Sequence, residues 1–383
     1  MMIQQIIMIV GTIFLVSYIC LLLYYLQAWL KAPTFLQEDD LQLNLPFLSI
    51  IIAARNEEDN LPGLLTDLLN QSFQKENFEV IVVDDHSTDN TAGIIKKRPS
   101  VKYISLQDHM IPGETFAFKK KAIEVAIQQA KGELIITTDA DCSVPKNWLQ
   151  TIARFYMKTG SNFIVMPVRM QPGNSALGIF QSLDFMVLQG ITGAAVHKKF
   201  HSMCNGANLA YTKKAFDQVG GFTGINHIAS GDDMLLMHKI YKLDAGAVYY
   251  LKSQEVMVST HSEKTIGQFF KQRIRWASKS DHYQDKSIFL VLLLVYLFNL
   301  YLLLLLIYLI FQGNHFLWKA CLSFVAIKTA VELIFLYPVA RFFNQKVLFL
   351  FFPLAQPFHI IYTVIAGFLG KFGSYQWKGR QLK

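Results

Sequence analysis

The stretch Leu134-Ile135-Ile136-Thr137-Thr138-Asp139-Ala140-Asp141 decides the fold of this chain. A short apolar run of this kind is typical of a strand buried on both faces of a parallel sheet. Similar runs that end in polar or acidic residues occur at 48–57 and 79–85, and apolar positions at helical spacing separate the three. This alternation predicts an α/β fold with a Rossmann-like, doubly wound sheet and right-handed connections.

Acidic or polar residues follow each predicted strand: Arg55-Asn56-Glu57, Asp84-Asp85 and Asp139-Ala140-Asp141. A single Asp after a strand is usually a turn or helix cap. Because ligands of open α/β sheets bind beyond the carboxyl ends of the strands, three such ends predict one crevice. Two carboxylates separated by one residue can hold a divalent cation and leave coordination sites open for phosphates. A sugar diphosphate needs such a partner, because the metal neutralises charge on the leaving diphosphate.

The apolar residues of the 383-residue chain, which is 52% hydrophobic, concentrate at its two ends. Residues 3–30 carry no charge and exceed the ~20 residues that a helix needs to cross a membrane. An uncleaved anchor is favoured over a signal peptide, because no basic n-region and no small-residue cleavage site accompany the run. Further apolar segments predict a division into four parts: an anchor (1–30), a catalytic domain (45–287, with halves 45–165 and 166–287), C-terminal membrane segments (288–370) and a basic tail (371–383).

The C-terminal segments and the basic residues beside them predict a multi-pass protein. Lys328 and Glu332 are four residues apart, so they share a helix face and can neutralise each other. Pro353 and Pro357 can break the last segment into a re-entrant or interfacial piece. By the positive-inside rule, the middle domain faces the cytoplasm of the cell (inner) membrane. This orientation follows from the basic residues beside the apolar segments: Lys31, Lys279, Lys286, Arg341 and Lys346. The basic tail is also expected there, which a re-entrant last segment allows.

The net charge of +8 does not predict a nucleic-acid partner. Much of the basic excess lies at membrane edges and in pairs such as Lys198-Lys199, which suit anionic headgroups. The four cysteines lack metal-ligand spacing, so neither zinc nor disulfides are predicted.

Residues 48–280, with their flanking apolar segments, resemble the inverting family 2 glycosyltransferases, whose GT-A fold has a mixed sheet. Six motifs carry the resemblance: Arg55-Asn56-Glu57-Glu58, Val83-Asp84-Asp85 with Ser87-Thr88-Asp89, Asp139-Ala140-Asp141, Gly206-Ala207-Asn208, Asp232-Asp233, and Gln272 to Trp276 as Gln-x-x-Arg-Trp. Their order and spacing are specific, although each motif alone is weak. Arg55 stands where the family more often has Tyr.

The resemblance implies roles for the donor-side residues. Glu57 and Asp85 would contact the nucleoside, in motifs that also include Asn56 and Asp84. Asp139 would contact the ribose or the metal, and Asp141 would bind the metal, Mg²⁺ or Mn²⁺. Two further residues have structural alternatives. Lys120, in the run 119–121, would touch phosphate or begin a solvated helix. His261 would support the metal or form a structural hydrogen bond.

On the acceptor side, the resemblance implies that Asp233 is the general base and that Asp232 and Asn208 bind substrate. Chemistry agrees, because displacement at an anomeric carbon needs a carboxylate to take the proton of the acceptor hydroxyl. Gln272 and Arg275 would support the diphosphate, since a guanidinium suits bidentate phosphate contact. Trp276 would form the acceptor wall.

The predicted reaction is transfer of a hexose from a UDP-sugar to a membrane lipid. The stretch 180–196 mixes apolar and polar residues, as expected either beside a membrane acceptor or in ordinary core packing. The tail Trp377-Lys378-Gly379-Arg380 resembles that of single-sugar lipid glycosyltransferases, and could equally be a surface anchor. A polysaccharide synthase of the same family is the alternative, although the apolar segments offer few polar residues for a water-lined pore. Two other classes stay open: a haloacid-dehalogenase-like phosphatase with Asp139 as nucleophile, and a non-catalytic scaffold.

Overall fold

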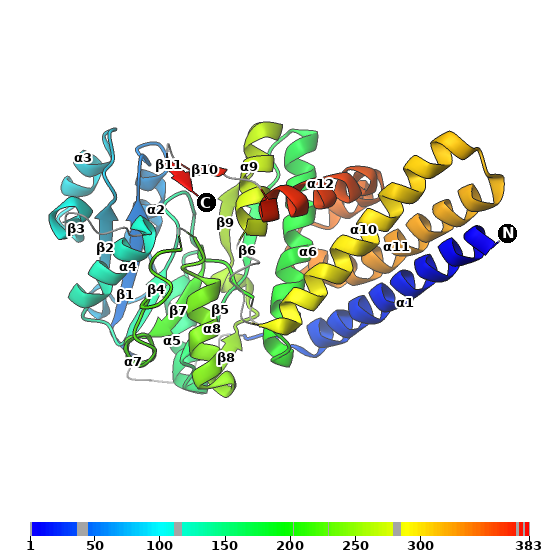
Figure 1. Cartoon of the computed structure of the whole chain (residues 1–383). Helices are drawn as coiled ribbons and strands as arrows, with labels where there is room; N and C mark the ends of the chain where they lie inside the picture. The colour runs from blue at the N-terminus through cyan, green and yellow to red at the C-terminus, as the bar shows by residue number, and fades with distance from the viewer. Residues whose placement is uncertain are drawn as a thin grey trace. The chain divides into compact units, whose positions relative to one another are not determined.

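The computed structural model describes residues 2–36, 45–110, 117–201, 203–228, 230–278 and 285–372, with the backbone of 375–377 and 380–382. The chain divides into two compact units. The sheet unit comprises 32–171 and 196–261, and the helical unit comprises 1–31, 172–195 and 262–383. Each unit is described separately, and Figure 1 gives the element labels.

A seven-stranded sheet with the order β3-β2-β1-β4-β7-β5-β8 forms the sheet unit. Its strands are β1 (Leu48–Ala54), β2 (Phe78–Asp84), β3 (Val101–Ser105), β4 (Leu134–Thr137), β5 (Phe163–Val165), β7 (Leu209–Thr212) and β8 (Val248–Tyr250). Strand β1 runs parallel to β2 and β4, whereas β7 is antiparallel to both β4 and β5. The predicted mixed, doubly wound sheet is confirmed.

The central strands are buried, as their apolar sequences predict. Ile50 and Ile52 of β1 and all four residues of β4 are buried, because helices connect the parallel strands and cover the sheet. The helices of this unit are α2 (Leu61–Leu69), α3 (Thr91–Lys96), α4 (Phe118–Gln129), α5 (Trp148–Thr159), α7 (Lys213–Gln218) and α8 (Met234–Leu243). A separate parallel pair contains β6 (Val168–Gln171) and β9 (Val258–His261). Short 3-10 turns cover Lys75–Asn77, Leu106–His109, Ala245–Ala247 and Gln254–Val256.

Long apolar helices dominate the helical unit. They are α1 (Met2–Lys31), α6 (Ala176–Lys198), α10 (Lys286–Gln312), α11 (His315–Phe342) and α12 (Phe352–Phe372), which follows the 3-10 turn Lys346–Phe351. All five are long and apolar enough to cross a membrane, although most of α6 is buried in protein. Helices α1, α10 and α11 pack side by side (Figure 1). The unit also contains α9 (Ile266–Ala277) and the antiparallel strands β10 (Tyr375–Trp377) and β11 (Arg380–Leu382).

Two features differ from the sequence-based picture. Helix α12 is not broken by its prolines: Pro353 lies in its first turn, where proline is tolerated, and Pro357 lies inside the helix. The compact units also do not follow the predicted block 45–287, because 172–195 and 262–278 group with the membrane segments. The reason is aromatic packing: Phe180 of α6 and Phe269 of α9 contact Phe358 of α12.

Candidate active site

The ends of β1 and β2 form a tightly bonded rim. Arg55 Nη1 donates to the Asp85 carbonyl at 2.9 Å and lies 3.8 Å from its carboxylate, which His86 Nδ1 also contacts at 2.9 Å. Asn56 adopts the left-handed conformation (φ 52°), and its side-chain oxygen accepts from the Thr88 amide at 2.8 Å. This rim therefore brings together the motifs that follow two neighbouring strands.

The other two predicted nucleoside-side carboxylates lie on the same rim. Asp84 is 8% exposed and accepts from the Ser87 amide at 3.2 Å, which shapes the loop after β2. Glu57 is partly exposed and accepts from the Asn60 side chain at 2.8 Å. Of these two groups, Glu57 is the more accessible to a ligand.

Lys119, at the start of α4, lies among the carboxylates beyond β4. Its ammonium is 2.7 Å from Asp139 Oδ1 and 3.1 Å from Asp232 Oδ2. Burial alone would lower the pKa of Lys119, but Asp139 and Asp232 raise it well above its ordinary value. The structure thus joins the Asp-x-Asp motif and the Asp232-Asp233 pair through one permanent cation.

Asp233 occupies the N-cap of α8. Its Oδ1 accepts from the Met234 amide at 2.7 Å, and its Oδ2 accepts from the Gly206 amide at 3.0 Å. A carboxylate at this position is oriented by backbone donors and favoured by the helix N-terminus. A Cβ at Gly206 would lie 3.4 Å from Asp232 Oδ2 and 3.5 Å from the Asp233 Cβ, at ordinary contact distance, so the two motifs lie beside each other.

Two predicted substrate contacts have structural positions instead. Asn208 is 0% exposed; its amide donates to the Pro167 and Val256 carbonyls, and its oxygen accepts from Trp148 Nε1. Lys120 is 2% exposed and donates to three backbone carbonyls that precede Asp232, those of Ile225, Ile228 and Ser230. Their polar groups are already used within the protein, so both side chains hold structural positions here and their substrate contacts stay predictions. Lys119, rather than Lys120, is the lysine at the carboxylates.

The predicted metal residues are only partly assembled. An antiparallel bridge pairs Ser143 with Ser259, which lie two residues from Asp141 and His261 respectively. Nevertheless, among the residues that the structure describes, no group of three or more His, Cys, Asp or Glu side chains could hold a metal ion. The predicted trio of Asp139, Asp141 and His261 therefore does not form a complete protein site.

The Gln-x-x-Arg-Trp motif lies on α9, in the helical unit. Thr265 and Gln268 form a capping box that fixes the start of this helix. Gln272 donates to Glu263 Oε1 at 3.0 Å, while Arg275 and Trp276 are partly exposed. Trp276 is therefore partly accessible near the end of α9.

Comparisons with known proteins agree with this architecture. The model of the glycosyl transferase family 2 matches residues 49–220. Glycosyltransferase AglE of Haloferax volcanii is 26% identical over 233 residues, which are 60% of this chain and 72% of that protein. Beta-monoglucosyldiacylglycerol synthase of Nostoc sp. is 26% identical over 249 residues, 63% of this chain and 50% of the synthase.

A polymer-forming relative and a solved structure complete the picture. Poly-beta-1,6-N-acetyl-D-glucosamine synthase of Staphylococcus epidermidis is 26% identical over 247 residues, 60% of this chain and 53% of the synthase. The chain thus spans about half the length of the two synthases. Mannosyltransferase PcManGT from Pyrobaculum calidifontis, solved with GDP-Man and Mn²⁺, is similar in fold with a TM-score of 0.55 and 17% identity, over 95% of this chain and 98% of that one. Together, the family match and the fold show that residues 49–220 of this chain form a glycosyl transferase family 2 domain with a GT-A fold.

Proposed function

We propose that this glycosyltransferase moves a hexose from a UDP-sugar to a hydroxyl of a membrane lipid with inversion. The observation that carries the proposal is the cluster in which Lys119 joins Asp139 to Asp232, beside the oriented carboxylate of Asp233. The phosphatase and scaffold alternatives are set aside, because residues 49–220 match the glycosyl transferase family 2 model.

Asp233 is the proposed general base. Backbone amides hold both of its oxygens, and neither amide competes for a proton, so the carboxylate can accept the proton of an acceptor hydroxyl. Deprotonation makes the acceptor oxygen a stronger nucleophile as it attacks the anomeric carbon, and the nucleoside diphosphate leaves from the opposite face. A single displacement inverts the anomeric centre and needs no enzyme nucleophile.

The donor is proposed to lie over the rim that Glu57 and Asp85 share. Lys119 supplies positive charge for the diphosphate, because its side chain is 26% exposed and its ammonium lies at the carboxylates. Gln272 and Arg275 are retained as proposed diphosphate contacts from α9. Arg55 lies 3.8 Å from the Asp85 carboxylate, so an ion pair orients this carboxylate.

A divalent cation, Mg²⁺ or Mn²⁺, fits the chemistry of Asp139 and Asp141. Lys119 shows that the carboxylates here hold a positive group. Since the described residues do not assemble three protein ligands, donor phosphates would complete the coordination, as is usual for Mg²⁺ in phosphate sites. Such a metal supplies Lewis-acid stabilisation of the leaving diphosphate. His261 is proposed to support it, on the basis of the Ser143–Ser259 bridge.

The lipid acceptor is inferred from the apolar helices and from the glycolipid-forming relative. Trp276 on α9 is the proposed acceptor wall.

We further propose that α10 and α11 cross the membrane fully while α12 does not. Helix α9 lies along α12, where a Cβ at Gly370 would be 2.5 Å from the Ala277 Cβ, and β10 contacts α9. The backbone of Trp377 and Arg380 therefore lies on the α9 side, proposed to be cytoplasmic; Lys279, Lys378 and Gly379 lie outside the described residues.

The test is transfer from a panel of radiolabelled nucleotide sugars into a membrane lipid extract, by membranes that carry wild type or Asp233→Asn. We expect label in the organic phase from a UDP-hexose, and its loss in the variant. Transfer that persists without Asp233 would refute the proposed site.

Polysaccharide synthesis is the second candidate, favoured by the polymer-forming relative. It predicts label in insoluble polymer instead of the organic phase. The same experiment separates the two products.

A further inference from the structure

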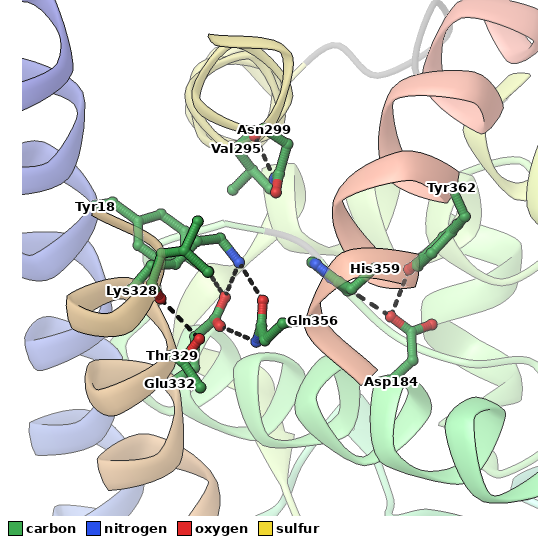
Figure 2. A network of polar contacts seen from close by, with 11 residues as sticks. Tyr18, Asp184, Val295, Asn299, Lys328, Thr329, Glu332, Gln356, His359 and Tyr362 are labelled. Atoms are coloured by element: carbon green, nitrogen blue, oxygen red, sulfur yellow. Dashed lines mark hydrogen bonds and ion pairs between the residues drawn. The ribbon is translucent and has the colours of Figure 1, made fainter. Parts of the chain in front are cut away.

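A buried polar cluster in the helical unit centres on Asp184 of α6, whose side chain is 5% exposed (Figure 2). Arg273 Nη2 of α9 lies 2.8 Å from Asp184 Oδ2. Tyr362 of α12 donates to Asp184 Oδ1, and His359 Nε2 of α12 lies 3.8 Å from the same oxygen. One carboxylate therefore ties three helices together.

Arg273 is held between two aromatic rings of its own helix. Its guanidinium carbon lies 5.1 Å from the Phe269 ring centroid and 4.2 Å from that of Trp276. Residues three or four apart share one face of a helix, so the side chains of Phe269, Arg273 and Trp276 stack along α9. A planar guanidinium stacks on aromatic faces in a way that an ammonium cannot match.

The guanidinium depends on Asp184 for its orientation. Among the described residues, the buried Nε and Nη1 atoms of Arg273 have no hydrogen-bond partner. The ion pair and the two rings are therefore what fix this side chain. Trp276 is partly exposed, and its ring contacts both Arg273, at 4.2 Å, and the Phe185 ring, whose centroid is 6.0 Å away. The position of Arg273 therefore constrains the indole.

A second buried cluster fixes α12, which supplies Tyr362 and His359. Lys328 Nζ lies 2.6 Å from Glu332 Oε1 and 3.1 Å from Gln356 Oε1, while Tyr18 of α1 donates to Glu332 (Figure 2). Gln356 lies one turn before His359 on α12. The helix that clamps Asp184 is thus itself anchored to α1 and α11.

We propose that Asp184 and Arg273 are positioning residues that set the Trp276 indole for the acceptor. This inference rests on the proposed function, in which Trp276 forms the acceptor wall. It assigns a role to Arg273, a variable position inside the Gln-x-x-Arg-Trp motif, and to Asp184, which lies nearly 90 residues earlier in the chain. Both act through Trp276 and neither is placed on the reacting atoms.

The test compares Asp184→Asn and Arg273→Lys with wild type, titrating the lipid extract and the UDP-sugar separately. Asp184→Asn keeps the side-chain volume and removes the negative charge, whereas Arg273→Lys keeps the positive charge and removes the planar guanidinium group. We expect each to raise the KM for lipid at least fivefold, with the KM for donor and the hydrolysis of donor by water unchanged. Asp184→Glu should restore the lipid KM to within twofold, and Lys271→Arg, on the exposed side of α9, should not change it.

A spectroscopic measurement distinguishes a change in the position of Trp276 from a general loss of structure. Acrylamide quenching of Trp276, obtained by difference from the matching Trp276→Phe proteins, should increase in both variants. An unchanged lipid KM in the folded Arg273→Lys protein, or a fall in kcat with both KM values unchanged, overturns the inference; if Asp184→Asn does not fold, Arg273→Lys decides. Asp233→Asn is measured alongside, because transfer that survives in it contradicts the proposed function rather than the positioning role.

Discussion

Replacing Lys119 by Met would remove the ammonium that pairs with both Asp139 and Asp232. A hydrogen bond to a charged group contributes about 1.5–3 kcal/mol, and Lys119 makes two contacts with carboxylates. The Asp139 side chain is 36% exposed, so solvent screening reduces this sum to about 2 kcal/mol. For a unit of this size, that loss lowers Tm by about 5 °C.

The loss should depend on pH in a defined direction. The neighbouring carboxylates raise the pKa of Lys119 in the folded protein despite its burial. The stabilisation of the fold by the Lys119 ammonium is therefore fully present below the pKa that Lys119 has in the unfolded chain. It is lost only as pH rises through the higher pKa of the folded protein. Wild type therefore keeps it throughout pH 5–9. In Lys119→Met, Asp139, Asp232 and Asp233 would no longer be paired by Lys119, and ionised carboxylates that lie this close repel one another.

The assay is thermal unfolding of the detergent-solubilised protein at pH 4.5 and 7.5, with and without Mn²⁺. The deficit of the variant should be larger at pH 7.5, and Mn²⁺ should stabilise the variant more than wild type, because Lys119 no longer competes for the carboxylates. Lys121→Met is the matched control, since Lys121 lies on the same helix and pairs with Glu124 at 3.6 Å. Equal deficits at both pH values, or a deficit no larger than that of the control, would refute the reasoning.

Three further outcomes are expected. Asp141→Ala should abolish Mn²⁺-dependent release of UDP from the donor, because it removes a proposed metal ligand; full metal-dependent turnover would contradict this. Asn208→Ala should lower stability by about 3 kcal/mol, measured by thermal unfolding, yet leave the KM of the folded protein for donor unchanged, because its buried bonds are structural. Glu332→Gln should cost about 3–5 kcal/mol by leaving Lys328 buried without its carboxylate, whereas the double change Lys328→Met with Glu332→Leu should unfold near the wild-type temperature.

The sheet could be predicted from sequence because its signals are local. The run 134–141 contains both the buried strand and the acidic residues that follow it, and a strand directs its carboxyl end to the ligand edge in any open α/β sheet. The pair Lys328 and Glu332 could be predicted for the same reason, since helical spacing alone places them on one face.

The direction of a single side chain is less predictable. Lys119 and Lys120 are neighbours at the start of one helix, and residues one apart project about 100° from each other. One ammonium reaches Asp139, while the other is buried against backbone carbonyls. Composition cannot tell them apart, because the choice depends on where α4 lies against the loop before Asp232. For Asn208, likewise, a motif gives the residue type but not whether it faces a ligand or the core.

The positioning of Trp276 shows why the acceptor side is the hardest to derive. Asp184 lies within a stretch that reads equally well as core packing or as a membrane interface, and nothing local marks its partner. The role of Asp184 becomes evident only in the folded protein, where α6, α9 and α12 pack together and bring Arg273 and Tyr362 to its carboxylate. A buried ion pair is weak evidence for stability, because removing its charges from water is costly. Its retention beside the Trp of the acceptor motif is better explained by orientation, which a pair of apolar residues would not supply.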